Sequence, residues 1–152
     1  MAIEYDLYLS NNMKPEQLME MLLGRIEELA WAEDKSFLTG PTMSVGTYEP
    51  RKSRQEAMEA GYGFAPALLI WFRRKFDAKP GRFAELLLEI TLLMLEHTQD
   101  AVLLFNGEIT VMQRLGGRIA FNAETNPGRD EAWLRSHFPL PFECRPLPSP
   151  LL

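Results

Sequence analysis

Apolar and polar residues follow two different periods in the first thirty residues. In Ile3–Leu9 every second residue is apolar, and Glu4 and Asp6 lie between them, so this segment is predicted to be a strand with one buried face. From Pro15 to Trp31, Leu and Ile recur at helical spacing while Glu residues fall on the opposite side. That pattern predicts an amphipathic helix, with the proline in the first turn, where a helix tolerates it.

The middle of the chain predicts two further strands and a second helix. Thr42–Tyr48 has β-propensity, and Ala67–Phe76 is apolar on both faces, which is typical of a central strand. Between them, Arg51–Gly63 is polar and ends in glycines, so we expect a mobile loop with one helical turn. Pro80–His97 is almost wholly Leu, Ile, Met and Phe, with Glu residues along one narrow stripe, and predicts a helix covered on most of its circumference.

The segment Ala101–Asn122 predicts a three-stranded antiparallel meander. Asn106-Gly107 and Gly116-Gly117 separate three short apolar runs, and such pairs tolerate the positive φ of two-residue hairpin turns. If both loops have two residues, the register follows. The resulting opposed pairs are Phe105 with Glu108, Leu104 with Ile109, Leu103 with Thr110, Val102 with Val111, Arg114 with Ile119 and Met112 with Phe121.

This register gives the meander two apolar faces. One face would carry Leu103, Phe105, Met112, Ile119 and Phe121 and receive the helices. The other would carry four aliphatic side chains. An exposed apolar patch of this size usually marks a surface that another segment, a partner or a ligand covers. Three coverings are open: the C-terminal tail through Trp133 and Phe138, a homodimer or partner interface, or a small-ligand cleft. The four residues of this candidate interface are Val102, Leu104, Ile109 and Val111.

These elements predict an α+β fold in the order βαββαβββ. We expect an antiparallel sheet of about five to six strands with the two amphipathic helices packed on one face. Residues 1–125 would form this domain. Residues 126–152 would be a proline-rich tail packed on the domain or extending from it, because five prolines between Pro139 and Pro150 exclude it from a sheet interior.

Charge is unevenly distributed along the chain. Arg51–Arg82 contains eight Lys and Arg against three carboxylates, whereas the rest of the chain has eight basic and eighteen acidic residues. The acidic remainder argues against nucleic acid and anionic lipid as partners. No segment resembles a membrane span or a secretory signal, and Cys144 is the single cysteine, so we expect a soluble cytoplasmic protein.

The sequence contains few residues of the types that carry out catalysis. His97 is expected at the end of the second predicted helix, and His137 and Cys144 lie in the tail, where a base would not be held rigidly. There is no phosphate loop, zinc spacing or nucleophile elbow, so we expect no cofactor, no metal and no enzyme. Two alternatives stay open: a small enzyme or ligand-binding domain with a carboxylate-lined cleft, and a homodimerising structural or regulatory subunit.

Two segments resemble a known family. AIEYDLYL at the start and DAVLLFNGEITVMQR in the meander are similar to small bacterial immunity proteins, the self-protection partners of contact-delivered swarming-inhibition toxins. The order of elements over most of Ala2–Asn122 is similar as well. The resemblance implies a non-catalytic cytoplasmic protein that binds a cognate protein toxin and blocks it. It gives no partner-binding residues.

Charge alone suggests where such a partner would bind. An acidic inhibitor suits a basic toxin, because complementary charge speeds encounter and selects partners. The candidate partner-binding residues lie on and after the first predicted helix. They are Glu20, Glu27, Glu28, Glu33 and Asp34.

Overall fold

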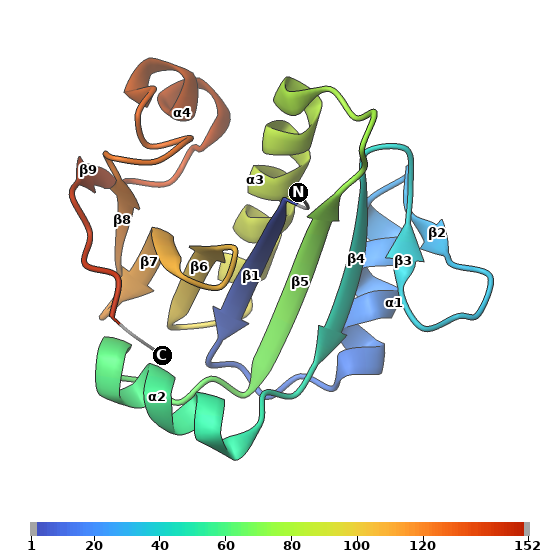
Figure 1. Cartoon of the computed structure of the whole chain (residues 1–152), viewed down its shortest axis with the longest axis horizontal. Coiled ribbons are helices and arrows are strands. Elements are labelled where there is room, and N and C mark those ends of the chain that lie inside the picture. Colours follow the sequence, from blue (N-terminus) through green and yellow to red (C-terminus); the bar gives the residue numbers. More distant parts are fainter. Residues whose placement is uncertain (1–2, 151–152) are drawn as a thin grey trace.

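The computed structural model describes residues 3–150, and within them nine strands form one sheet (Figure 1). The strands are β1 (Glu4–Leu9), β2 (Ala30–Trp31), β3 (Leu38–Thr39), β4 (Met43–Tyr48), β5 (Leu68–Arg74), β6 (Ala101–Phe105), β7 (Ile109–Leu115), β8 (Arg118–Asn122) and β9 (Glu143–Arg145). The helices are α1 (Pro15–Arg25), α2 (Lys52–Tyr62), α3 (Pro80–Leu95) and α4 (Glu131–His137). In space the strand order is β2-β3-β4-β5-β1-β6-β7-β8-β9.

The predicted α+β class is confirmed, but the predicted size is wrong. The sheet has nine strands instead of five to six, and four helices are present in the described residues instead of two. Neighbouring strands are antiparallel except for β8 and β9, which are parallel. The missed strands β2, β3 and β9 have only two or three residues each, so they are too short to show a period of two.

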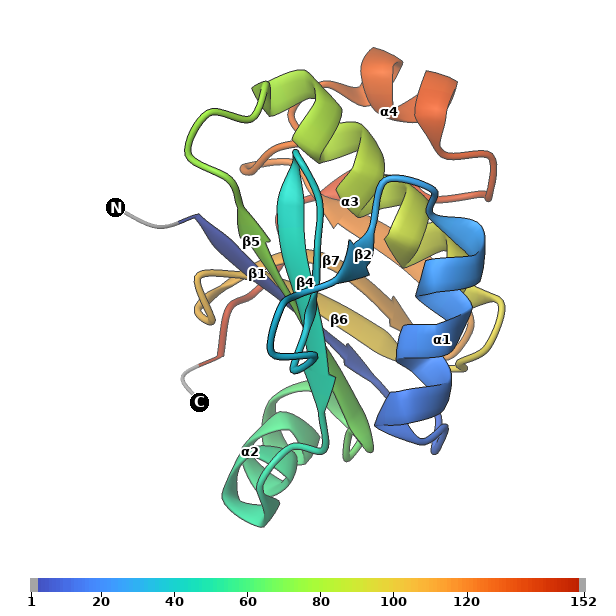
Figure 2. The same ribbon diagram turned by 90° about the vertical axis from the view of Figure 1, so that its right-hand side faces the viewer.

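Helices α1 and α3 pack on one face of the sheet, as predicted, and form the main core with it (Figure 2). Helix α3 starts at Pro80, and nine of its residues are buried, which agrees with its nearly continuous apolar surface. The core brings α3 against Leu7 of β1, Phe72 of β5 and Phe121 of β8, none of which is exposed. The layer formed by α1 and α3 therefore packs against the central strands of the sheet and buries them on this face.

Part of the opposite face of the sheet is covered by α2, where the sequence predicted a mobile loop. Arg51–Gly63 forms a helix that ends at Gly63, whose φ of +89° is a left-handed cap. Met58 and Tyr62, one turn apart, pack on Val102 and Leu104. The prediction failed because this helix buries only these two residues, so its sequence lacks an apolar stripe.

Helix α1 ends at Arg25 instead of Trp31. Ile26 and Leu29 are buried, as their helical spacing suggested, but the chain leaves the helix at Ile26 and becomes extended. Ala30 and Trp31 then pair with β3 as the edge strand β2. The pairs Ala30 with Thr39 and Trp31 with Leu38 join residues nine and seven positions apart. This strand pairing overrides the local helical pattern, and hydrophobic periodicity cannot reveal it.

The meander forms as predicted, with one corrected register. At Gly116-Gly117 both φ angles are positive, and Arg114 opposes Ile119 as expected. In the first hairpin Phe105 opposes Ile109 instead of Glu108, because the loop has three residues. The observed pairs then include Leu104 with Thr110, Leu103 with Met112 and Val102 with Gln113, and the ladder is irregular at Leu103 and Leu104.

Residues 126–150 add structure at the β8 edge. In α4, Asp130 caps the helix by accepting a hydrogen bond from the backbone N–H of Trp133 at 3.1 Å. Phe138 is 2% exposed and stacks edge-on with Phe121 of β8, with 5.1 Å between ring centroids. Strand β9 follows and pairs with the outer side of β8, a position open to a proline-rich segment because only one side needs donors.

Candidate functional site

The predicted acidic residues lie at the β2 end of the sheet (Figure 1). Glu20 is exposed on α1, and Glu27 is exposed in the segment that follows it. Glu33 and Asp34 are exposed in the loop between β2 and β3. Residues 14–35 carry six carboxylates against Lys14, Arg25 and Lys35, so this end of the molecule has a net negative charge.

Glu28 differs from the other four acidic residues because it is engaged inside the protein. Its carboxylate forms an ion pair with Arg82 of α3 and accepts a hydrogen bond from the Thr42 hydroxyl at 2.8 Å. It therefore joins the segment after α1 to the start of β4 and to α3. A partner cannot use this carboxylate without breaking these contacts.

An exposed aromatic side chain lies between Glu27 and Glu33 along the chain. Trp31 on the edge strand β2 is 38% exposed, and tryptophan is among the residues that contribute most to protein interfaces. The hydroxyl and backbone N–H of Ser36 both donate to Asp34, which lowers the pKa of that carboxyl and keeps it charged. We call the following set the acidic edge: Glu20, Glu27, Trp31, Glu33 and Asp34.

The second predicted surface, the four aliphatic residues of the meander, is not an open patch. Val102 and Leu104 are fully buried beneath α2. Val111 packs on the opposite side, in the main core, because the irregularity in β7 reverses its direction. Only Ile109, 39% exposed, reaches solvent among the four.

Of the three coverings that the sequence left open, the C-terminal tail contributes in part, but not through Trp133 and Phe138. Trp133 and Phe138 pack with the main core on the α3 side of the sheet. On the outer face the chain end contributes through Thr110, which donates its hydroxyl to the Pro148 carbonyl at 2.8 Å and its N–H to the Ser149 hydroxyl at 3.0 Å. Helix α2 and residues 148–149 together cover this part of the sheet.

The histidines and the cysteine lie in separate places. His97 is exposed just after α3, and His137 stacks on Trp133 in α4 with 4.2 Å between ring centroids. Cys144 lies on β9, where burial and the neighbouring Glu131 raise the pKa of its thiol. Among residues 3–150, no three His, Cys, Asp or Glu side chains are grouped so that they could hold a metal ion.

A polar hollow of about 640 Å³ lies between α2 and the outer face of the sheet. Asp6 and Tyr8 of β1 line one side, and Arg54 of α2 lines the other. Burial raises the pKa of Asp6 to about 6, Glu4 adds to the shift, and Arg54 opposes it. Burial likewise raises the pKa of Tyr8 to about 12.

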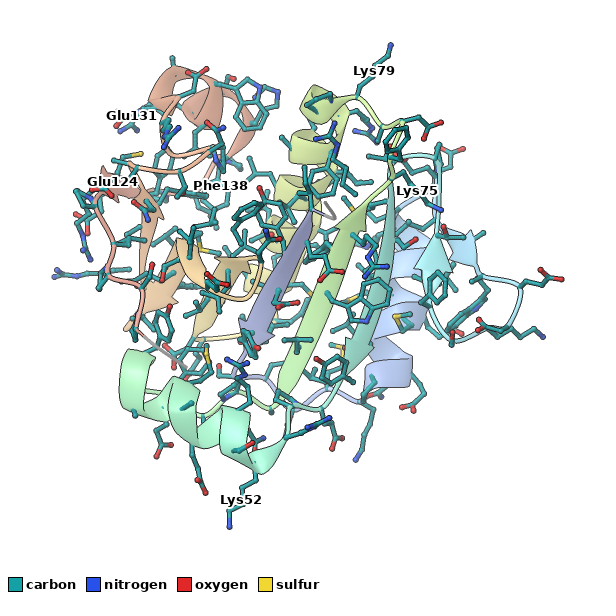
Figure 3. All side chains as sticks on the ribbon, in the orientation of Figure 1. Lys52, Lys75, Lys79, Glu124, Glu131 and Phe138 are labelled. Atoms are coloured by element: carbon teal, nitrogen blue, oxygen red, sulfur yellow. The ribbon has the colours of Figure 1, made fainter. Side chains whose placement is uncertain are left out.

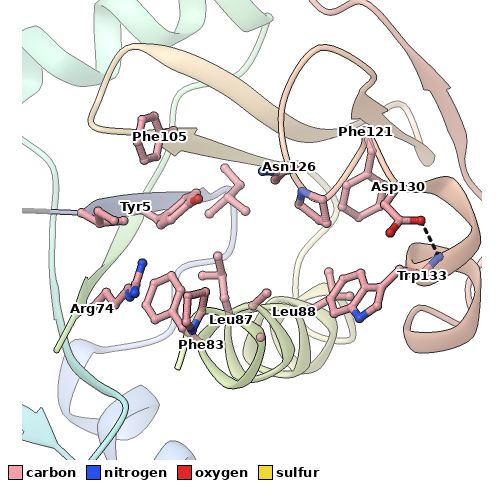
Figure 4. Close-up of a pocket in the computed structure, with 16 residues that line it drawn as sticks. Tyr5, Arg74, Phe83, Leu87, Leu88, Phe105, Phe121, Asn126, Asp130 and Trp133 are labelled. Atoms are coloured by element: carbon pink, nitrogen blue, oxygen red, sulfur yellow. Dashed lines mark hydrogen bonds between the residues drawn. The ribbon is translucent and has the colours of Figure 1, made fainter. Parts of the chain in front are cut away.

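A second, apolar groove of about 500 Å³ lies on the α3 side (Figure 4). Its walls come from β1, β6, the start of α3 and the segment that leads into α4. Near it the β5–α3 connection is basic, and Figure 3 shows Lys79 projecting from the body of the molecule. Sequence reasoning missed this groove, because it forms between elements that are distant along the chain.

Comparison with known proteins identifies the class. A family model described as SitI3-like matches residues 3–132, so the chain belongs to the SitI3-like family. SitI proteins are immunity proteins for swarming-inhibition toxins, which confirms the resemblance found in the two sequence segments. Neither the curated proteins nor the solved structures provide a match to this chain. Within residues 3–150, no helix is both long and apolar enough to span a bilayer.

Proposed function

We propose that this protein binds a cognate contact-delivered toxin in the cytoplasm and neutralises it by binding alone, without a catalytic step or a cofactor. Membership of the SitI3-like family is the observation that carries the proposal. The partner is a protein whose docking surface is basic, since the acidic edge would meet it.

The acidic edge has the features of a docking surface for a basic protein. Its four carboxylates steer a positively charged partner during encounter, which raises the association rate. Trp31 supplies a large, partly exposed apolar side chain, of the type in which interfaces concentrate their binding energy. The short edge strand β2 has one side without a neighbouring strand, so its backbone is accessible there.

Survival on co-expression tests the function. The toxin encoded beside this gene in the source genome is expressed with the wild-type protein or with the triple variant Glu27→Lys, Glu33→Lys, Asp34→Lys. We expect the wild type to protect the cells and the variant to fail. The matched control reverses the same amount of charge elsewhere, with Glu56→Lys, Glu59→Lys and Glu108→Lys, and should protect. Protection by both variants would contradict the proposed surface, and no protection by the wild type would contradict the pairing.

The polar hollow beneath α2 favours one alternative, a small enzyme or ligand-binding domain. Carboxylates and arginines converge there, with Asp6 opposite Arg54. If the hollow carried the function, Asp6→Asn would abolish protection. Under our proposal this variant protects as well as the wild type, because Asp6 lies outside the acidic edge.

A further inference from the structure

The apolar groove on the α3 side has the size and composition of a small-ligand site. Its volume of about 500 Å³ lies within the range of such sites, which are mostly apolar with a few placed polar groups. Leu87 and Leu88 of α3 form the floor, and Tyr5, Phe105 and Trp133 stand around it (Figure 4). Tyr5, Phe105 and Trp133 are each only partly buried, so apolar surface is left for a ligand to cover.

One end of the groove carries a cation. Arg74 of β5 lies there with Tyr5, whose phenol is close enough for the two groups to interact electrostatically. The Arg74 Nη2 atom donates to the Ala78 carbonyl at 3.2 Å, while its Nε atom is buried without a hydrogen-bond partner. Within residues 3–150, Arg74 forms no ion pair. The guanidinium lines the groove and its positive charge is paired with no carboxylate of the described residues, so this end favours an anionic group.

The opposite end of the groove carries a carboxylate. Figure 4 shows Asp130 beside Trp133, far from Arg74 within the groove. One Asp130 oxygen caps α4, and the group as a whole disfavours a second carboxylate at this end. The two ends therefore allow an anionic ligand only one orientation.

We propose that the groove binds an apolar monocarboxylate of the fatty-acid type. Its carboxylate lies at Arg74 and the Tyr5 hydroxyl, and its hydrocarbon chain runs over Leu87 towards Trp133. The charged head satisfies the guanidinium, and the chain removes the apolar walls from water. A neutral molecule of the same shape leaves the guanidinium unpaired, and a cation is repelled by it. This site is separate from the acidic edge and does not depend on the toxin.

Calorimetric titration of the full chain with decanoate, decanol and decylammonium tests the charge requirement. We expect saturable binding of one decanoate, with decanol at least about tenfold weaker and decylammonium without binding. The variant Arg74→Met keeps the apolar stem and should weaken decanoate by about tenfold or more. The matched control Arg73→Met changes the neighbouring arginine, which is exposed and paired with Glu4, and should bind as the wild type does. Equal affinity for decanoate and decanol, or no saturable decanoate binding, would overturn the proposal.

Fluorescence quenching tests the orientation in a way that does not need the Arg74 variant to fold. A decanoate with bromine on its terminal carbon should quench Trp133, because the chain end lies against that indole. The quenching should disappear in Trp133→Phe and persist in Trp31→Phe. If it persists in Trp133→Phe, or if a decanoate brominated beside its carboxylate quenches more strongly, the proposed orientation is wrong.

Discussion

The hydroxyl of Tyr62 at the end of α2 lies 2.5 Å from the hydroxyl of Thr110 in β7. Because the Thr110 hydroxyl gives its proton to the Pro148 carbonyl, the Tyr62 hydroxyl is the donor to Thr110. Three distant segments therefore meet in one buried chain of hydrogen bonds. This arrangement holds α2 against the part of the outer face that Val102 and Leu104 form.

Truncating the buried side of α2 should destabilise the whole domain. Met58 is fully buried between α2 and the sheet, so Met58→Ala should lower the free energy of unfolding by about 2–5 kcal/mol. Urea denaturation of the wild type and of the variant measures this change in the free energy of unfolding. Glu59→Ala, exposed on the same helix, should change stability by less than about 0.5 kcal/mol. Similar small effects for both variants would mean that α2 is not packed on the sheet.

Two glycines should respond to alanine in opposite directions. A Cβ atom at Gly46 of β4 would overlap the Trp71 ring, so Gly46→Ala should destabilise by about 1–3 kcal/mol. At Gly24 in α1 a Cβ meets nothing within 4 Å, so Gly24→Ala should stabilise by up to about 1 kcal/mol. Thermal unfolding of the two variants gives both signs in one experiment, and a stabilising Gly46→Ala would contradict the close packing of Trp71.

Asp6 should make stability fall as pH rises from about 4 to about 6. Its pKa in the folded protein is about 6, above the ordinary value of 3.8, so the folded state holds this proton more tightly and ionisation disfavours folding. Asp6→Asn should therefore stabilise the protein at pH 7 by about 1–2 kcal/mol, allowing for the partial exposure of the side chain.

Urea denaturation of wild type and Asp6→Asn at both ends of this pH range is the measurement. The difference between the two proteins should be smaller at the lower pH, because Asp6 is then protonated in the folded state and partly protonated in the unfolded state. A constant difference at both pH values would show that Asp6 does not titrate in this window.

Variants at the adjacent residues Glu27 and Glu28 should affect different properties: stability at Glu28 and toxin association at Glu27. Glu28→Gln breaks the ion pair with Arg82 and should cost on the order of 1 kcal/mol of stability. Glu27→Gln should leave stability unchanged because its side chain is exposed, yet slow toxin association. Chemical denaturation and association kinetics on both variants check this, and a stability loss at Glu27 equal to that at Glu28 would contradict the assignment.

Much of the fold could be predicted from local patterns. Strands β1, β5 and β8 and helix α3 follow from their periods and turn residues, because each has a long apolar signal. Helix α2 could not be found from periodicity, but Gly63 directly after Tyr62 was a C-cap signal that pointed to a helix end. The predicted register of the first hairpin was wrong because the pair Asn106-Gly107 is compatible with a loop of two residues and with a loop of three.

Only part of the candidate site could be predicted from the sequence. Clustering of Glu20, Glu27, Glu33 and Asp34 was visible as charge segregation. The role of Glu28 was not, because its partners Thr42 and Arg82 are brought to it by tertiary packing. Burial of Val102 and Leu104 depended on α2, and the groove at Arg74 depended on several elements that are distant along the chain.

Association kinetics between the acidic edge and the toxin test the central claim most directly. The toxin domain is immobilised, and the on-rates of wild type and of Glu27→Lys, Glu33→Lys, Asp34→Lys are compared at low and at high salt. We predict that the variant associates at least about tenfold more slowly at low salt and that the gap narrows at high salt, because screening removes the steering of the wild type. An unchanged on-rate for the variant, with the Glu56→Lys, Glu59→Lys, Glu108→Lys control slowed instead, would contradict the account.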